Sequence, residues 1–237
     1  MEKNIILLFS DLEGTILREL DGLYSDEDME QFLSQIDKLQ TLTNSQVKIH
    51  LVSPVYQKQM EEVMSKIDRN IIRYNRVHRD SREIQEIESA AAYPEIGMSH
   101  GEFLGDRITE LKRPINERDF DTARYGKAHY VRTWCESYKE NDYVNLKMAI
   151  YCGNGRNDLT AMDYINGKVE GKRRGLVVCP DNTRREAKAK AFHVSSKTDL
   201  LGIAEGIEAI NKEIEKRIQN QENPDQRFKR APGGVEL

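Results

Sequence analysis

Residues 5–17 read IILLFSDLEGTIL, and this stretch decides the fold. An unbroken apolar run, Ile5–Phe9, leads to Asp11 and Glu13, and Gly14-Thr15 then turns the chain. Such a run, ended by turn residues, is typical of a parallel strand that is covered on both faces. Ligands of parallel sheets bind beyond the carboxyl ends of the strands. The two acids therefore stand where we expect a functional site.

Further apolar stretches alternate with segments of helical spacing. Ser25, followed three residues later by Asp28, indicates the N-cap of a first helix. Ser53-Pro54 indicates the start of a second helix, because proline is tolerated in the first turn. Helices are also predicted over about 127–138, from 158 and from 198, and strands over 47–52, 146–151, 175–179 and 193–195. The alternation predicts an α/β fold, a Rossmann-like three-layer sandwich with a central parallel sheet.

The length of 237 residues allows one core domain with a modest insertion. We expect the core to comprise residues 1–69 and 125–219, because the predicted strands and helices fall in these two ranges. The less regular range 70–124 is expected to form a small inserted cap. The last residues, 220–237, mix proline, glycine and charge, and are expected to form a flexible tail.

Charge and hydropathy exclude several classes of partner. The net charge is −4, so no overall basic field points to nucleic acid, which makes a nucleic-acid partner unlikely. The apolar run near the start is too short for a membrane span or a secretory signal. The three cysteines, Cys135, Cys152 and Cys179, lack metal-type spacing and are expected as buried or free thiols in a reducing cytoplasm. The oligomeric state stays open.

The residues after the first predicted strand suit phosphoryl chemistry. Asp11 can act as a nucleophile, because a carboxylate can attack phosphorus and form an acyl-phosphate. Glu13 can then act as acid and base, protonating the leaving oxygen and later activating water. The turn at Gly14 and Thr15 directs backbone amides toward phosphoryl oxygens.

Other chain segments are expected to complete the site. Ser53, at the end of a predicted strand, offers a hydroxyl, and the following helix start offers an amide to the same phosphate. Lys127 can neutralise the charge that builds up during transfer. Asp158 and Asn154 provide oxygen ligands of the kind that Mg²⁺ prefers.

The chain resembles phosphatases of the haloacid dehalogenase superfamily, in pattern most nearly the Cof-type and sugar-phosphatase branch. Four motifs occur in the order that this family has: FSDLEGT, HLVSP, YGKAHYV and YCGNGRND. The resemblance implies an aspartyl-phosphate on Asp11, phosphate binding by the Ser53-Pro54 motif and Lys127, and a Mg²⁺ site. It assigns that site to Asp11, the backbone carbonyl of Glu13, Asn154 and Asp158.

Two positions depart from the family pattern. Glu13 stands where the family usually has aspartate, although enolase-phosphatases of the same superfamily also read Asp-x-Glu-Gly-Thr. Asn154 stands where an aspartate normally supplies a charged metal ligand. An amide oxygen can still bind Mg²⁺ but brings no charge, so weaker metal binding is expected.

Each candidate also has an ordinary structural interpretation. Asp11 can cap a turn, Ser53 can be a plain N-cap, and Lys127 can be solvated. Asn154 and its neighbours can form a simple strand–helix turn. The Arg- and His-rich range 69–83 is either a solvated face or a contact for an anionic substrate, through Arg73, Arg76, His78 or Arg79.

The function predicted from these residues is a Mg²⁺-dependent phosphatase acting on a small phosphorylated metabolite, such as a sugar phosphate. A phosphotransferase shares its first step. The alternative from another class is a weakly active or inactive protein of the same fold that binds a phospholigand or a partner. Processing of nucleic-acid ends is a third interpretation, which the overall charge does not support.

Overall fold

The computed structural model describes residues 3–12, 14–16, 24–79, 82–84, 88–93, 117–139, 144–168 and 174–222. For 54–62, 88–93, 117–126, 139 and 221–222 it describes the backbone alone. These residues form a parallel sheet of the order β3-β2-β1-β4-β5-β6. Its strands are β1 (Lys3–Ser10), β2 (Gln46–Tyr56), β3 (Glu88–Tyr93), β4 (Val144–Cys152), β5 (Gly175–Cys179) and β6 (His193–Val194).

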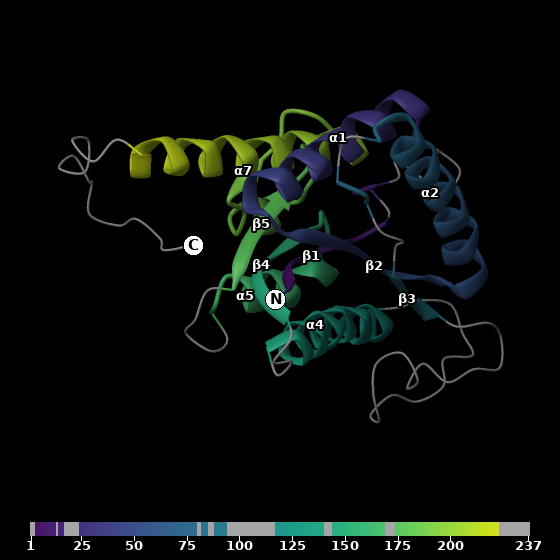
Figure 1. Ribbon diagram of the computed structural model, residues 1–237. Helices are drawn as coiled ribbons and strands as arrows, with labels where there is room; N and C mark the ends of the chain where they lie inside the picture. Colours follow the sequence, from purple (N-terminus) through teal and green to yellow (C-terminus); the bar gives the residue numbers. More distant parts are fainter. Residues whose placement is uncertain are drawn as a thin grey trace.

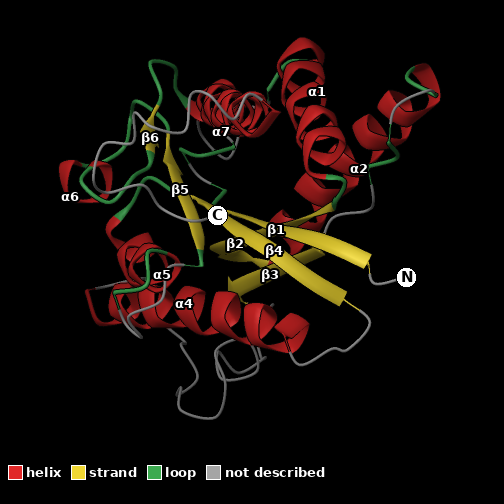
Figure 2. Cartoon of the chain, turned by 60° about the vertical axis from the view of Figure 1, so that its left-hand side comes forward, coloured by secondary structure: helices red, strands yellow, loops and turns green. Residues whose placement is uncertain are grey.

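Helices cover both faces of this sheet, which confirms the predicted α/β sandwich (Figures 1 and 2). One layer holds α1, α2 and α7, and the other holds α4 and α5. The helices are α1 (Asp26–Thr43), α2 (Gln57–Val77), α4 (Glu117–Lys139), the 3₁₀ turn η1 (Arg156–Asp158), α5 (Leu159–Ile165), α6 (Arg185–Lys188) and α7 (Asp199–Glu222).

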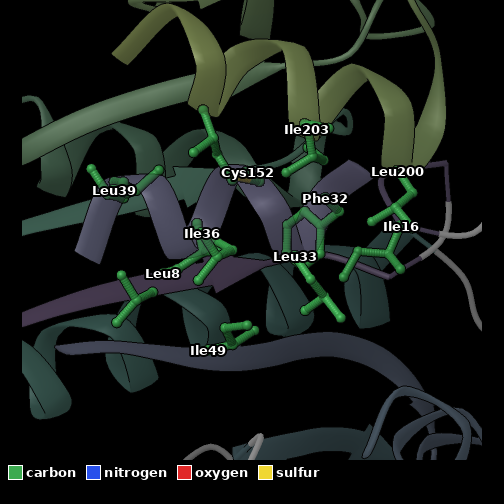
Figure 3. Packing of buried hydrophobic residues seen from close by; sticks show 14 of the residues in the cluster. Leu8, Ile16, Phe32, Leu33, Ile36, Leu39, Ile49, Cys152, Leu200 and Ile203 are labelled. Carbon is green, nitrogen blue, oxygen red and sulfur yellow. The ribbon is translucent and has the colours of Figure 1, made fainter. Parts of the chain in front are cut away.

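Strand β1 lies inside the sheet and is apolar on both faces, as its sequence predicts. Ile6 and Leu8 point into the core beneath α1 and α7, where Figure 3 shows Leu8 among the residues of both helices. Ile5, Leu7 and Phe9 point into the second core, against α4 and α5. Side chains of a strand alternate between its two faces, so a central strand that is covered on both must be apolar throughout.

The first helix begins where its capping residues predict. Ser25 Oγ accepts a hydrogen bond from the backbone N–H of Asp28, and the Asp28 carboxylate accepts one from Ser25 N–H, both at 3.1 Å. This reciprocal pair is a capping box, which satisfies two amides that the helix itself leaves unpaired. The prediction of a helix from this point is confirmed.

The predicted helix start at Ser53-Pro54 is wrong. Both residues belong to β2, and α2 begins only at Gln57. Ser53 pairs with Ala91 of β3, and the register shifts before the next pair, Tyr56 with Tyr93. A proline is tolerated at such an irregularity because no ladder hydrogen bond is required of its nitrogen there.

The helix predicted over about 127–138 begins earlier, because α4 runs from Glu117 to Lys139 and Lys127 lies within it. Glycine costs only about 1 kcal/mol in a helix interior, so a single Gly126 does not end one.

The domain boundary predicted between residues 69 and 70 differs from the observed elements. Helix α2 runs through it to Val77, and β3, within the range expected for the cap, pairs with β2 in the core sheet. The cap, predicted over 70–124, stays a prediction, because 94–116 lie outside the described residues, whereas 117–124 belong to α4. The tail was predicted over 220–237; its first three residues belong to α7, and 223–237 lie outside the described residues.

The three cysteines are all buried and free, as expected. No helix within the described residues has the length and apolar character needed to cross a membrane.

An aromatic cluster joins β1 and β2 to α4 on the second face of the sheet. The His50 ring is 5.0 Å from the Phe9 ring and 4.7 Å from the Trp134 ring, between their centroids. Its Nδ1 lies 3.1 Å from the hydroxyl of Tyr130. Burial, together with the nearby Lys48 ammonium, lowers the pKa of His50 to about 3.

This imidazole makes the folding stability depend on pH. In the unfolded chain His50 binds a proton below pH of about 6.5, whereas the folded protein resists protonation down to about 3. The contribution of neutral His50 to the free energy of unfolding is therefore fully present above pH 6.5 and is lost as the pH falls toward 3. We expect the free energy of unfolding to fall by about 2–3 kcal/mol between pH 6.5 and pH 4.5, because each pH unit in this range costs about 1.36 kcal/mol.

The measurement is the free energy of unfolding against pH for wild type and His50→Gln, which cannot titrate. The difference between the two curves isolates His50 from the carboxylates, which titrate in both proteins. Parallel curves between pH 7 and 4.5 would contradict the buried, neutral imidazole.

Candidate functional site

The sheet brings the predicted motifs to one edge. The strand order places β2 and β3 on one side of β1 and β4–β6 on the other, so the chain changes direction between β1 and β4. Ligands of open α/β sheets bind at this switch point, beyond the carboxyl ends of the strands. Asp11 follows β1 and its N–H donates to the carbonyl of Cys152, the last residue of β4, at 2.9 Å.

Lys127 links the two acids of the site. Its Nζ lies 2.7 Å from Asp11 Oδ1 and 2.8 Å from Asp158 Oδ1. The ammonium comes from α4, whereas the acids follow β1 and β4, so three distant segments converge. The Lys127 side chain is 1% exposed, which excludes the solvated-lysine interpretation.

Asp158 is held on both of its carboxylate oxygens. Oδ1 accepts from Lys127 Nζ and from the Tyr151 hydroxyl, each at 2.8 Å. Oδ2 accepts from the backbone N–H groups of Asn154 at 3.1 Å and Gly155 at 2.8 Å. This carboxylate therefore fixes the loop after β4 and orients Lys127.

Two glycine-dependent features surround these contacts. A Cβ at Gly153 would lie 2.7 Å from Asp158 Cγ, so a side chain at that position would displace the carboxylate. Gly14 has a φ of 64°, the left-handed region that favours glycine, and a Cβ there would press on the Asn154 side-chain amide. The turn after β1 thus packs directly against Asn154.

The site carries an unbalanced negative charge. Two carboxylates, Asp11 and Asp158, face one ammonium in a buried place. Burial, followed by repulsion from Asp158, raises the pKa of Asp11 to about 7, although Lys127 opposes the shift. Burial disfavours the charged form of Lys127, but attraction to Asp11 and Asp158 outweighs it, so the pKa of Lys127 is raised.

Two buried hydroxyls at the same edge make no hydrogen bond to the part of the chain that the structure describes. They are Thr15 Oγ1, in the turn after β1, and Ser53 Oγ, in β2. Ser10 pairs with Leu51, so Ser53 lies where β2 passes the end of β1. A buried hydroxyl without a partner costs free energy, and a bound oxyanion would supply the missing acceptor.

The remaining predicted residues stay predictions. Glu13 lies outside the described residues, so its acid/base role and its carbonyl ligand are untested. Pro54 is described only by its backbone in β2. Of the Arg- and His-rich range, Arg73 pairs with Asp26 at 2.5 Å and His78 with Glu30 at 2.6 Å, both acids at the start of α1.

The donor set at this edge suits a hard divalent cation. Asp11, Asn154 and Asp158 offer oxygens, the ligand type that Mg²⁺ prefers, and the site's negative charge is only partly balanced. Within the described ranges no group of three acidic, histidine or cysteine side chains is gathered to hold a metal. Both Asp158 oxygens already accept two hydrogen bonds each, so this carboxylate has less capacity left for a metal ion.

Sequence reasoning missed the loop after β5, which contacts the loops that follow β1 and β4. Asn182 Nδ2 donates to the Gly14 carbonyl at 2.8 Å, and Thr183 Oγ1 donates to the Gly153 carbonyl at 3.5 Å. Arg184 N–H donates to the Asn154 carbonyl at 3.1 Å. The available signal was that this loop follows a predicted strand, 175–179, because the carboxyl ends of parallel strands lie at the same edge of a sheet.

Asn182 is expected to act as a positioning residue for the Gly14 turn. The isosteric Asn182→Asp removes the donor to the Gly14 carbonyl and is expected to lower kcat roughly 3- to 10-fold, the worth of one hydrogen bond. KM and thermal stability should change little, because Asn182 is exposed. Steady-state kinetics on an aryl phosphate measure kcat and KM separately.

Asp181→Asn is the matched control for this loop. It alters the exposed Asp181–Lys188 pair, 3.1 Å apart, and leaves the bond to Gly14 in place. Equal loss of kcat in both variants would mean that Asn182 acts only through the general fold of the loop.

Comparisons with known proteins give structural neighbours alone. No model of a known protein family matches the chain, and no curated protein matches it. A haloacid dehalogenase-like hydrolase from Bacillus subtilis is 13% identical, with 88% of this chain and 93% of that chain covered and a TM-score of 0.48. The cobalt-bound deoxy-D-mannose-octulosonate 8-phosphate phosphatase from Haemophilus influenzae is 11% identical, with coverages of 92% and 94% and a TM-score of 0.47.

A protein from Thermoplasma acidophilum is 17% identical, with 89% of this chain and 98% of that chain covered and a TM-score of 0.47. The structural neighbours thus include hydrolases of the superfamily that the four motifs resemble. At such low identities and TM-scores, the likeness decides nothing about function. The chemistry is therefore inferred from the chain's own residues.

Proposed function

We propose that this protein is a phosphatase that hydrolyses the ester of a small phosphorylated metabolite through a covalent aspartyl-phosphate on Asp11. The observation that carries the proposal is the buried ammonium of Lys127, held between Asp11 and Asp158 at the switch point of the sheet. A buried lysine held in this way beside a candidate nucleophile is suited to stabilise charge on a transferring phosphoryl group.

In the first step a carboxylate oxygen of Asp11 attacks phosphorus, and the phosphorus–oxygen ester bond breaks. The alcohol leaves with a proton from an acid, the role predicted for Glu13. The Thr15 and Ser53 hydroxyls and the Lys127 ammonium donate to the phosphoryl oxygens. In the second step water, losing a proton to the same base, attacks the aspartyl-phosphate, which releases phosphate and restores Asp11.

We assign Mg²⁺ as the cofactor, held by oxygens of Asp11 and Asn154, with Asp158 as a further candidate. When bound, the ion supplies positive charge that offsets the two carboxylates and the substrate phosphate. Lys127 and Tyr151 each donate a hydrogen bond to Asp158 Oδ1 and so hold this carboxylate in place. We expect the protein to work in a reducing compartment such as the cytoplasm, which suits its three free thiols.

The test is hydrolysis of an aryl phosphate and of a panel of sugar phosphates, with and without Mg²⁺. We expect Mg²⁺-dependent release of phosphate by wild type and no measurable release by Asp11→Asn. Asp181→Asn, the same change at an exposed aspartate, is the control and should retain activity. Activity that persists in Asp11→Asn would contradict the covalent mechanism.

Asn154 favours a second candidate, a protein that binds a phospholigand without turning it over. A neutral amide at this position weakens metal binding, and turnover would fall with it. Mg²⁺-dependent thermal stabilisation with no hydrolysis across the panel would support this candidate. Stabilisation by inorganic phosphate that is lost in Ser53→Ala would locate the ligand at the same edge.

A further inference from the structure

Tyr151 is the largest side chain that is fully buried among the described residues. It belongs to β4, and its ring lies in the second core together with Phe9, its register partner in β1. Phenylalanine would fill nearly the same volume without carrying a polar group into the core. Because burying a hydroxyl costs free energy unless a partner accepts its hydrogen bond, the partner that Tyr151 has here indicates what the hydroxyl does.

The partner of this hydroxyl is Asp158, at the candidate site. Tyr151 donates to Asp158 Oδ1 at 2.8 Å, and the same oxygen accepts from Lys127 Nζ at 2.8 Å. Burial, together with the charges of Asp158 and Asp11, raises the pKa of Tyr151 well above its usual value of 10. The hydroxyl therefore keeps its proton and acts as a donor to Asp158, not as a base.

Lys127 lies between two carboxylates that compete for its ammonium. Its Nζ is 2.7 Å from Asp11 Oδ1 and 2.8 Å from Asp158 Oδ1. The O–H dipole of Tyr151 places positive charge beside Asp158 Oδ1, which lowers the negative potential that the ammonium meets there. The hydroxyl thus weakens the attraction of Lys127 to Asp158, and the ammonium stays as close to Asp11 as to Asp158.

We propose that Tyr151 is a positioning residue, which keeps the Lys127 ammonium beside Asp11 by donating a hydrogen bond to Asp158 Oδ1. It acts through Asp158 and Lys127, and we assign it no contact with the substrate. The consequence for catalysis rests on the phosphatase function proposed above, whereas the placement of Lys127 does not depend on that function.

Tyr151→Phe removes the hydroxyl and keeps the ring. Lys127 would then be the one side-chain donor to Asp158 Oδ1 among the described residues, so Asp158 would draw the ammonium away from Asp11. A catalytic group misplaced by about 1 Å can cost about 100-fold in rate, so we expect kcat on an aryl phosphate to fall roughly 10- to 100-fold. KM should change little, because the lost hydroxyl makes no proposed contact with phosphate.

The ammonium of Lys127 can also be observed without any substrate. Its side chain is 1% exposed, so its protons are shielded from exchange with water, and the full-length protein labelled with ¹⁵N-lysine should show its Nζ resonance. The absence of this resonance in Lys127→Arg assigns it. We expect Tyr151→Phe to shift the resonance, because the hydrogen bonds of the ammonium change when Asp158 loses its second donor at Oδ1.

Tyr164→Phe is the matched control. Tyr164 is a buried tyrosine of α5 in the same core, with its ring centre 4.1 Å from the Arg174 guanidinium carbon, so this change leaves the bond from Tyr151 to Asp158 in place. It should keep both the wild-type kcat and the wild-type Lys127 resonance.

An unchanged Lys127 resonance in Tyr151→Phe would overturn the proposal, whether or not the protein hydrolyses phosphate esters. If wild type hydrolyses none, the phosphatase function fails, and a shifted resonance still supports the placement of Lys127 by Tyr151. A wild-type kcat in Tyr151→Phe, in an enzyme that is active, would overturn the proposed positioning role in catalysis. A lower melting temperature with the resonance and kcat unchanged would mean that Tyr151 supports the fold alone.

Discussion

Lys127→Met is expected to abolish turnover and to lower the free energy of unfolding by about 3–5 kcal/mol, the cost of removing one partner from a buried ion pair. Methionine is unbranched and nearly as long as lysine, so this substitution removes the charge of Lys127 and little of its volume. Asp11 and Asp158 would then face each other without the ammonium that lies 2.7 and 2.8 Å from them. Activity on an aryl phosphate and urea unfolding measure the two effects.

A double variant separates the structural role of Lys127 from the catalytic role that we propose for it. Lys127→Met with Asp158→Asn removes one positive and one negative charge, which should recover much of the lost stability but none of the activity. The single variant Asp158→Asn is the reference for the double one. If Lys127→Met keeps both wild-type stability and activity, the ion-pair arrangement does not operate in solution.

Much of the fold could be predicted from local sequence, because its signals are strong and short-range. The unbroken apolar run Ile5–Phe9, ended by turn residues, is typical of a strand with two covered faces, and that is how β1 lies. The Ser25 capping box fixed the start of α1 in the same way. Each of these features is specified by neighbouring residues, so no knowledge of distant contacts is needed.

Local signals were misleading where tertiary pairing decides the structure. Ser53-Pro54 has the composition of a helix start, but pairing with β3 keeps it in β2. A helix was predicted from about residue 127, just after Gly126, but α4 begins at Glu117 and continues through this glycine. In both places a weak local preference is overridden by longer-range packing or by continuation of a helix.

The candidate site could be predicted in its parts but not in its connections. Motif order placed Asp11, Lys127 and Asp158 at one edge, and their contacts agree with that placement. The hydroxyl of Tyr151, which donates to Asp158, was missed because β4 reads as a plain apolar strand. Asn182 was missed because its partner, Gly14, is distant in sequence.

Among the glycines compared here, Gly175 is the position at which substitution by alanine is expected to lower the free energy of unfolding most. Gly175 pairs with Ala149 at the start of β5, and a Cβ there would lie only 1.6 Å from the Ala149 carbonyl oxygen. Ala149 cannot yield, because the contacts are with its backbone, which is paired within the sheet. We expect a loss above about 4 kcal/mol, the exceptional end of single substitutions, measured by urea unfolding.

Val177→Ala on the same strand is the matched control. It removes two methyl groups from the second core without a clash and should cost about 1–3 kcal/mol, in the range of other large-to-small core changes. We expect the effect of Gly175→Ala to reach the candidate site, because β5 leads into the loop in which Asn182 and Arg184 donate hydrogen bonds to the carbonyls of Gly14 and Asn154. Activity should therefore fall in Gly175→Ala even where folded protein remains, whereas Val177→Ala should keep it. Similar unfolding free energies for the two variants would mean that β5 does not pair with β4 in this register.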